Sequence, residues 1–146
     1  MPNLPLSEAT IVGIVLANMT IFTLWFFPPA WRVLNRLFIS TPLKPSAFSM
    51  LGNVFSHKSP VHLLSNMTLL WLLGTRLHED IGRGDFLAIY IFAGVFGSTL
   101  SLTSFLMRNV LVSSSLGASG SVAGIVGAYC ALHPKYAPPY LPLESC

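Results

Sequence analysis

Two long stretches of the sequence carry no charged side chain, residues 9–27 and 86–107. Each exceeds the roughly 18 apolar residues that an α-helix needs to cross the hydrocarbon core of a bilayer. Only 9% of the 146 residues are charged, against about 25% in a typical soluble domain, so a soluble fold could not hide this much apolar surface. We therefore expect an all-α, multi-pass integral membrane protein, because helices satisfy their own backbone hydrogen bonds in lipid.

Two shorter apolar segments complete a predicted bundle of four spans. We expect an N-terminal segment at 1–8, a membrane domain at 9–133 and a proline-rich tail at 134–146. Within the membrane domain the spans are expected at about 9–27, 60–77, 86–107 and 117–132.

The connections between the spans differ in character. After the first span, Trp31, Leu34 and Leu37 recur at helical spacing while Arg32 and Arg36 take another face. This pattern predicts a short amphipathic helix lying in the membrane interface. The segment 76–85 mixes charges of both signs with two glycines, which predicts a compact, solvated turn.

Composition excludes several classes of function. The net charge is only +3 and the basic residues are scattered, so nothing indicates nucleic-acid binding. Cys130 and Cys146 fit no disulfide or metal pattern, and we expect neither a metal nor a cofactor. Residues 1–8 contain no Lys or Arg, so targeting is expected to be internal or to depend on an upstream part of the chain.

A serine between glycines opens the last predicted span, in the run Leu116-Gly117-Ala118-Ser119-Gly120-Ser121. Ser119 would lie in the first helical turn, where free N–H groups and the helix dipole favour the oxyanion of acyl transfer. A 16-residue helix rises only about 24 Å, so its start would be recessed below one membrane surface. The alternative is that these small residues form only a helix-packing face.

The second predicted span contains two polar side chains four residues apart. His62 and Asn66 share a helix face, and polar side chains in hydrocarbon are costly unless they face the protein interior or a wet cavity. They would either line a site or serve as hydrogen-bonding glue between helices. The sequence of this span does not favour either interpretation over the other.

Together, the His62-x-x-x-Asn66 pair, the Gly117-Ala118-Ser119-Gly120 motif and the amphipathic first connection resemble the rhomboid family of intramembrane serine proteases. The run 74–82 looks most similar to mitochondrial rhomboids of the fungal type. The resemblance implies a helical bundle with four of the six core spans of that family, in the mitochondrial inner membrane. It also implies transmembrane proteins as substrates.

The resemblance assigns Ser119 as the nucleophile and His62 with Asn66 as the oxyanion hole. Backbone around the nucleophile, at Gly117, Ala118 and Gly120, would complete the site.

The family's base histidine lies on a sixth span, and no residue of this chain matches it. The 146 residues are therefore expected to be inactive or nearly so by themselves, as part of a longer protease. The alternative function is that of a catalytically inactive rhomboid-like protein that binds transmembrane segments.

Overall fold

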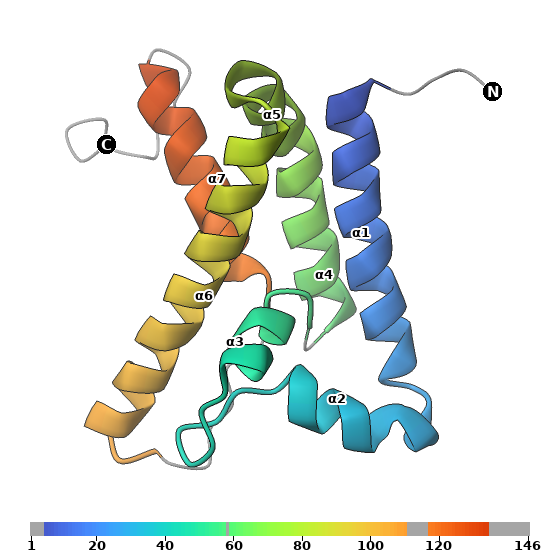
Figure 1. Ribbon diagram of the computed structural model, residues 1–146, viewed down its shortest axis with the longest axis vertical. Helices are drawn as coiled ribbons and strands as arrows, with labels where there is room; N and C mark the ends of the chain where they lie inside the picture. Colours follow the sequence, from blue (N-terminus) through green and yellow to red (C-terminus); the bar gives the residue numbers. More distant parts are fainter. Residues whose placement is uncertain (1–4, 58, 111–116, 135–146) are drawn as a thin grey trace.

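A computed structural model describes residues 5–57, 59–110 and 117–134 (Figure 1). Long helices run side by side along the molecule: α1 (Leu6–Leu24), the helical rod that ends in α5 (Thr75–Ile81), α6 (Arg83–Met107) and α7 (Ser119–Leu132). Two short helices, α2 (Trp31–Leu37) and α3 (Ala47–Asn53), lie near one end of the bundle, which we call the lower end. A single 3₁₀ turn, η1 (Pro28–Ala30), leads from α1 into α2. The described residues thus form an all-α fold.

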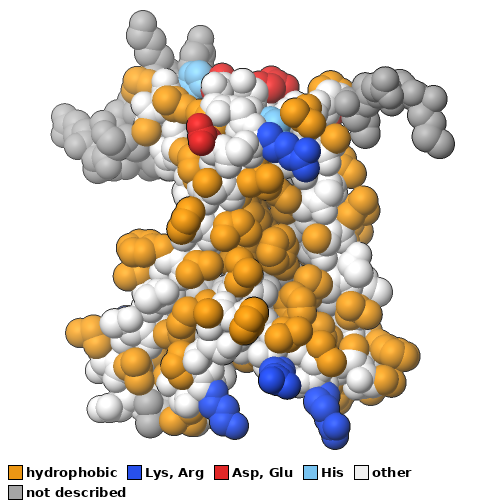
Figure 2. Space-filling view, in the orientation of Figure 1, with side chains coloured by type: hydrophobic (Ala, Val, Ile, Leu, Met, Phe, Trp, Pro, Cys, Tyr) orange, Lys and Arg blue, Asp and Glu red, His pale blue; other side chains and the backbone are white. Residues whose placement is uncertain are grey.

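Several hydroxyl side chains of the long helices are satisfied within their own helix, as suits segments surrounded by lipid. Thr20 and Thr23 donate hydrogen bonds to carbonyls four residues earlier in α1, and Thr99 and Thr103 do the same in α6. By length and composition, α1 and α6 could each cross a membrane, and α7 is a shorter apolar helix. Figure 2 shows hydrophobic side chains over the middle of the visible face, with charged ones gathered toward the two ends.

The second span is a longer helical rod than expected. Helix α4 (Pro60–Leu69) starts behind Ser59, whose hydroxyl accepts a hydrogen bond from the backbone N–H of His62 at 3.2 Å. The helix passes through one π-helical stretch, η2 (Leu70–Gly74), and continues directly as α5.

The prediction of a solvated turn at 76–85 was wrong, because most of this segment is helical. The fully buried side chain of Leu77 anchors α5 in the core, and His78 is only 3% exposed. The Nε2 atom of His78 lies 3.1 Å from the hydroxyl of Thr10 on α1. The turn is confined to Gly82, whose positive φ of 84° allows α6 to begin at the next residue.

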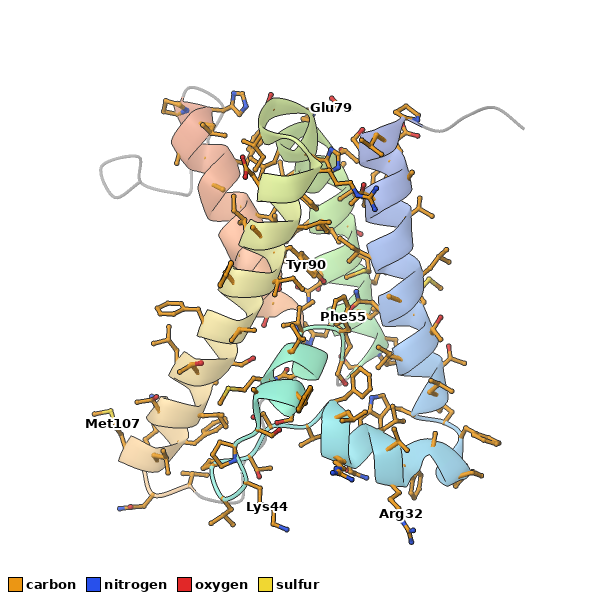
Figure 3. All side chains as sticks on the ribbon, viewed as in Figure 1. Arg32, Lys44, Phe55, Glu79, Tyr90 and Met107 are labelled. Atoms are coloured by element: carbon orange, nitrogen blue, oxygen red, sulfur yellow. The ribbon has the colours of Figure 1, made fainter. Side chains whose placement is uncertain are left out.

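The core lies between α1, η2, α6 and α7, where Ile11, Leu70, Phe86 and Ile125 are fully buried. Above α3, the rings of Phe55 and Tyr90 pack with their centroids 6.0 Å apart (Figure 3). This packing fixes the residues after α3 against α6, and so sets the place of the segment that leads into α4.

Helices α6 and α7 approach each other through small residues. The Cα atoms of Gly97 and Gly120 face each other, and a side chain at Gly97 would lie 3.1 Å from the Cα of Gly120. Residues 93–97 occupy the middle of α6, so the first turn of α7 lies at mid-length of that helix rather than at its end. Ser119 is therefore set well inside the bundle's length, as the shortness of the last span predicts.

Candidate active site

Ser119 is the first residue of α7 and its side chain is exposed. It lines a cavity of about 370 Å³ at the junction of α6 and α7. The lining is formed by small residues with one leucine, namely Gly94, Gly97, Ser98, Leu100, Ser101, Gly117, Ser119 and Gly120. The small side chains leave the serine hydroxyl accessible to another group, as a nucleophile requires.

Gly117 is required where it stands for two reasons. Its φ of +132° is a backbone conformation that L side chains rarely adopt. A Cβ at this position would also lie only 2.7 Å from the Cε1 atom of His62. The imidazole of His62 therefore packs directly over the backbone two residues before Ser119, and α4 meets the start of α7 at the predicted motif.

Asn66 lies one turn after His62 on α4 and is buried, but its recorded contact is with a different histidine. Its Nδ2 atom is 3.2 Å from Nε2 of His57, in the segment between α3 and α4. If the amide donates this bond, the imidazole proton of His57 is on Nδ1, which is buried without a partner. The second hydrogen of the Asn66 amide is then available for another acceptor.

His57 is a site residue that sequence reasoning missed. It is 4% exposed, and its ring lies edge-on to that of His62 with centroids 5.3 Å apart. Burial, and secondarily the charge of His62, lower the pKa of His57 from 6.5 to about 4. His57 is therefore neutral at physiological pH, and acts as a hydrogen-bond partner that holds the Asn66 amide.

Asn53 is a second missed residue, at the end of α3. Its Oδ1 atom accepts a hydrogen bond from the N–H of Gly117 at 2.9 Å, and its Nδ2 atom donates to Ser98 at 3.1 Å. Ser98 in turn donates to the carbonyl of Gly94 at 3.0 Å. Asn53 is completely buried, and it links the serine motif to α6 through a continuous series of hydrogen bonds.

No histidine hydrogen-bonds to Ser119 among the residues that the structure describes. His133 ends up at the far end of α7, where its Nε2 atom lies 2.7 Å from Asp80 on α5. Within the same described ranges, no group of three or more His, Cys, Asp or Glu side chains could hold a metal ion. The arrangement therefore brings together the start of α7, His62 and the polar groups behind them.

Comparison with known proteins gives consistent matches to one family. Residues 44–145 match the family described as Rhomboid domain. "Rhomboid protein 1, mitochondrial" from Saccharomyces cerevisiae is 36% identical over 119 residues, which cover 80% of this chain and 34% of that protein. "Presenilin-associated rhomboid-like protein, mitochondrial" from Homo sapiens is 34% identical over 134 residues, covering 91% of this chain and 35% of that protein.

A more distant relative, "RHOMBOID-like protein 12, mitochondrial" from Arabidopsis thaliana, is 26% identical over 140 residues, covering 86% of this chain and 42% of that protein. The chain spans about a third of the length of the yeast and human relatives. No solved structure matches it significantly.

Proposed function

The chain belongs to the rhomboid family, and on that premise we propose that it forms the nucleophile-bearing part of an intramembrane serine endopeptidase. Its family and relatives make it an integral membrane protein of mitochondria, and we propose the inner membrane as its site. The proposed substrates are proteins with a transmembrane segment, which would reach a serine recessed within the bundle from the membrane side.

In the proposed reaction, the hydroxyl oxygen of Ser119 attacks the carbonyl carbon of the scissile peptide bond and passes its proton to a base. The carbonyl oxygen gains negative charge as the tetrahedral intermediate forms. The side chains of His62 and Asn66 and the backbone N–H groups of Ala118 and Ser119 would donate to that oxygen. Collapse breaks the C–N bond and releases the amine half of the substrate, which takes the proton back from the base. Water then hydrolyses the serine ester.

The proposal is carried by the position of His62 against Gly117. A helix-packing serine would need no polar side chain from another span beside it, whereas an oxyanion hole requires donors that converge next to the nucleophile. The His57–Asn66 contact supports the same reading, because it orients a buried amide without using its second hydrogen.

A second candidate function is binding of transmembrane segments without cleavage. It is favoured by the absence of a histidine hydrogen bond to Ser119 within the described residues, since a serine hydroxyl without an adjacent base is a weak nucleophile. Both candidates use the same cavity, and they differ in whether Ser119 is needed.

The test uses the protein purified from its own membranes with an antibody against residues 79–85, most of which are exposed. Reconstituted into liposomes with a single-span peptide, it is expected to cleave that peptide within the membrane segment, as read by mass spectrometry. Ser119→Ala should abolish cleavage, whereas Ser101→Ala, which removes another hydroxyl from the same cavity, should not.

Cleavage that survives Ser119→Ala would refute the nucleophile assignment. Equal retention of an uncleaved peptide by the wild type and by Ser119→Ala would favour the binding function instead.

A further inference from the structure

The lower end of the molecule carries charge of one sign. Among the described residues, Arg32, Arg36, Lys44 and Arg108 lie there, while the acidic side chains lie at the opposite end with α5 and the helix starts. Figure 3 shows Arg32 and Lys44 at the lower end and Glu79 at the upper one. The lower end therefore presents uncompensated positive charge to whatever faces it.

Helix α2 lies across this end, roughly perpendicular to the long helices (Figure 1). An amphipathic helix in this orientation lies in the plane of a membrane interface when the long helices cross the bilayer. Its exposed side chains include Trp31 and Val33, at 50% and 56% exposure, beside the exposed guanidinium groups. One helix thus presents apolar and cationic groups together at the level of lipid headgroups.

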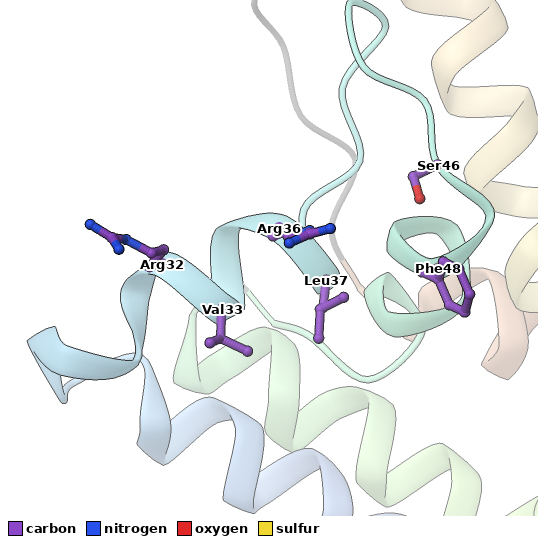
Figure 4. Close-up of a pocket in the computed structure, with 6 residues that line it drawn as sticks. All are labelled: Arg32, Val33, Arg36, Leu37, Ser46 and Phe48. Carbon is purple, nitrogen blue, oxygen red and sulfur yellow. The ribbon is translucent and has the colours of Figure 1, made fainter.

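A pocket of about 520 Å³ lies between α2 and α3 (Figure 4). Its lining combines two cations, three apolar side chains and a hydroxyl, namely Arg32, Arg36, Val33, Leu37, Phe48 and Ser46. Phe48 is 75% exposed, although aromatic rings are among the side chains that proteins most often cover. The two arginines are four residues apart, so they extend from neighbouring turns of the same helix.

We propose that this pocket binds an anionic phospholipid, with the headgroup phosphate between Arg32 and Arg36 and the first part of an acyl chain against Leu37 and Phe48. The guanidinium fork matches the geometry of phosphate oxygens. The apolar wall selects a lipid over a free phosphate ion, which would gain nothing from Phe48. The occupant would anchor α2 and α3, and through Asn53 the backbone before Ser119.

Native mass spectrometry of the detergent-solubilised chain tests the proposal, with phosphatidylglycerol and phosphatidylcholine of identical acyl chains as probes. The wild type is expected to retain one phosphatidylglycerol in preference to phosphatidylcholine. At about fivefold per cation, the double variant Arg32→Gln/Arg36→Gln should weaken phosphatidylglycerol binding about thirtyfold. The matched control Lys44→Gln/Arg108→Gln removes the same amount of charge from the same end of the molecule, at residues outside the pocket. It should weaken phosphatidylglycerol binding less than threefold, which is less than the effect expected for the loss of a single cation that contacts the lipid.

Phe48→Ser gives a second arm that leaves the charge unchanged and is expected to weaken binding of the same lipid. Equal losses in the two double variants would overturn the proposal in favour of diffuse attraction. Displacement of the lipid by inorganic phosphate, with no effect of Phe48→Ser, would overturn it in favour of an anion site. Either result leaves the Ser119 assignment untouched, because lipid retention does not require cleavage.

Discussion

Replacing Gly124 by alanine should weaken the packing of α7 on α6. A Cβ at Gly124 would collide with the methyl group of Ala93, and the Ala93 Cα lies 3.8 Å from it. Neither methyl group has a rotamer through which it can move aside, so the two helices must separate. Because α7 begins at Ser119, such a separation would also displace the candidate nucleophile.

The magnitude follows from a comparison within the same helix. Overpacking of this kind costs about 1–3 kcal/mol. Alanine is also a better helix former than glycine by about 1 kcal/mol, which partly hides that cost. At Gly127, three residues further on, a Cβ meets nothing within 4 Å, so Gly127→Ala contributes the propensity gain alone. The difference in unfolding free energy between the two alanine variants should therefore be about 1–3 kcal/mol, with Gly124→Ala the less stable.

The assay is unfolding of each purified variant in mixed micelles with increasing dodecyl sulfate, followed by circular dichroism. The midpoint for Gly124→Ala should fall below that for Gly127→Ala, and a larger residue at 124 should lower it further. Coincident midpoints for the two alanine variants would refute the reasoning, because they would mean that α6 and α7 do not meet at closest approach there.

Three further outcomes follow from the site. Gly117→Ala places a side chain at a residue with positive φ and against the ring of His62, and should cost about 1–3 kcal/mol in the same unfolding assay. Adding His62→Ala should recover part of that cost, because it removes the ring that the new methyl group meets. A double variant as unstable as Gly117→Ala alone would argue against the contact. Because burial lowers the pKa of His57 from 6.5 to about 4, the unfolded chain takes up this proton first as the pH falls. The contribution of His57 to stability should therefore be complete above pH 6.5 and be lost progressively toward pH 4; His57→Gln should flatten this profile, and an unchanged profile would contradict the assignment. Asn53→Leu removes both side-chain bonds of Asn53, the one from the Gly117 N–H at 2.9 Å and the one to Ser98 at 3.1 Å, and leaves that N–H only the longer bond to the Asn53 backbone carbonyl at 3.3 Å. It should cost about 1–3 kcal/mol, more than Ser98→Ala, which removes only the second of these bonds; equal costs would show that the bond to Gly117 adds nothing to stability.

The positions of the long helices could be predicted because a helix surrounded by hydrocarbon requires a long uncharged run in the sequence. Uncharged runs at 9–27 and 86–107 overlap α1 and α6, and the spacing of Trp31, Leu34 and Leu37 predicted a short helix where α2 lies. The last span was predicted at about 117–132 with Ser119 in its first turn, and α7 begins at Ser119, two residues later. The roles of Ser119, His62 and Asn66 stay predictions.

The parts that escaped prediction depend on tertiary packing. His57 and Asn53 stand in a stretch with no distinctive spacing, and they reach the serine motif only because α3 folds up against α6. The charges at 76–85 suggested a turn, but α5 keeps Leu77 and His78 inward while Glu79 and Asp80 face out. The charged residues that suggested a turn belong to the exposed face of that helix, and the buried face contributes too few residues to stand out in the composition.

The π-helical stretch at Leu70–Gly74 decides how the second span responds to the loss of a residue. A π turn holds about one residue more than an α turn, so deleting one residue there would restore an uninterrupted α-helix. Because the wide turn had already absorbed the extra residue, the side chains beyond it would keep their direction about the helix axis. His78 would still face Thr10, and Glu79 would still accept the hydrogen bond from the Ser7 hydroxyl at 2.9 Å. A second deletion would find no wide turn to absorb it, and would rotate every later side chain by about 100°, so that a different face of α5 met α1.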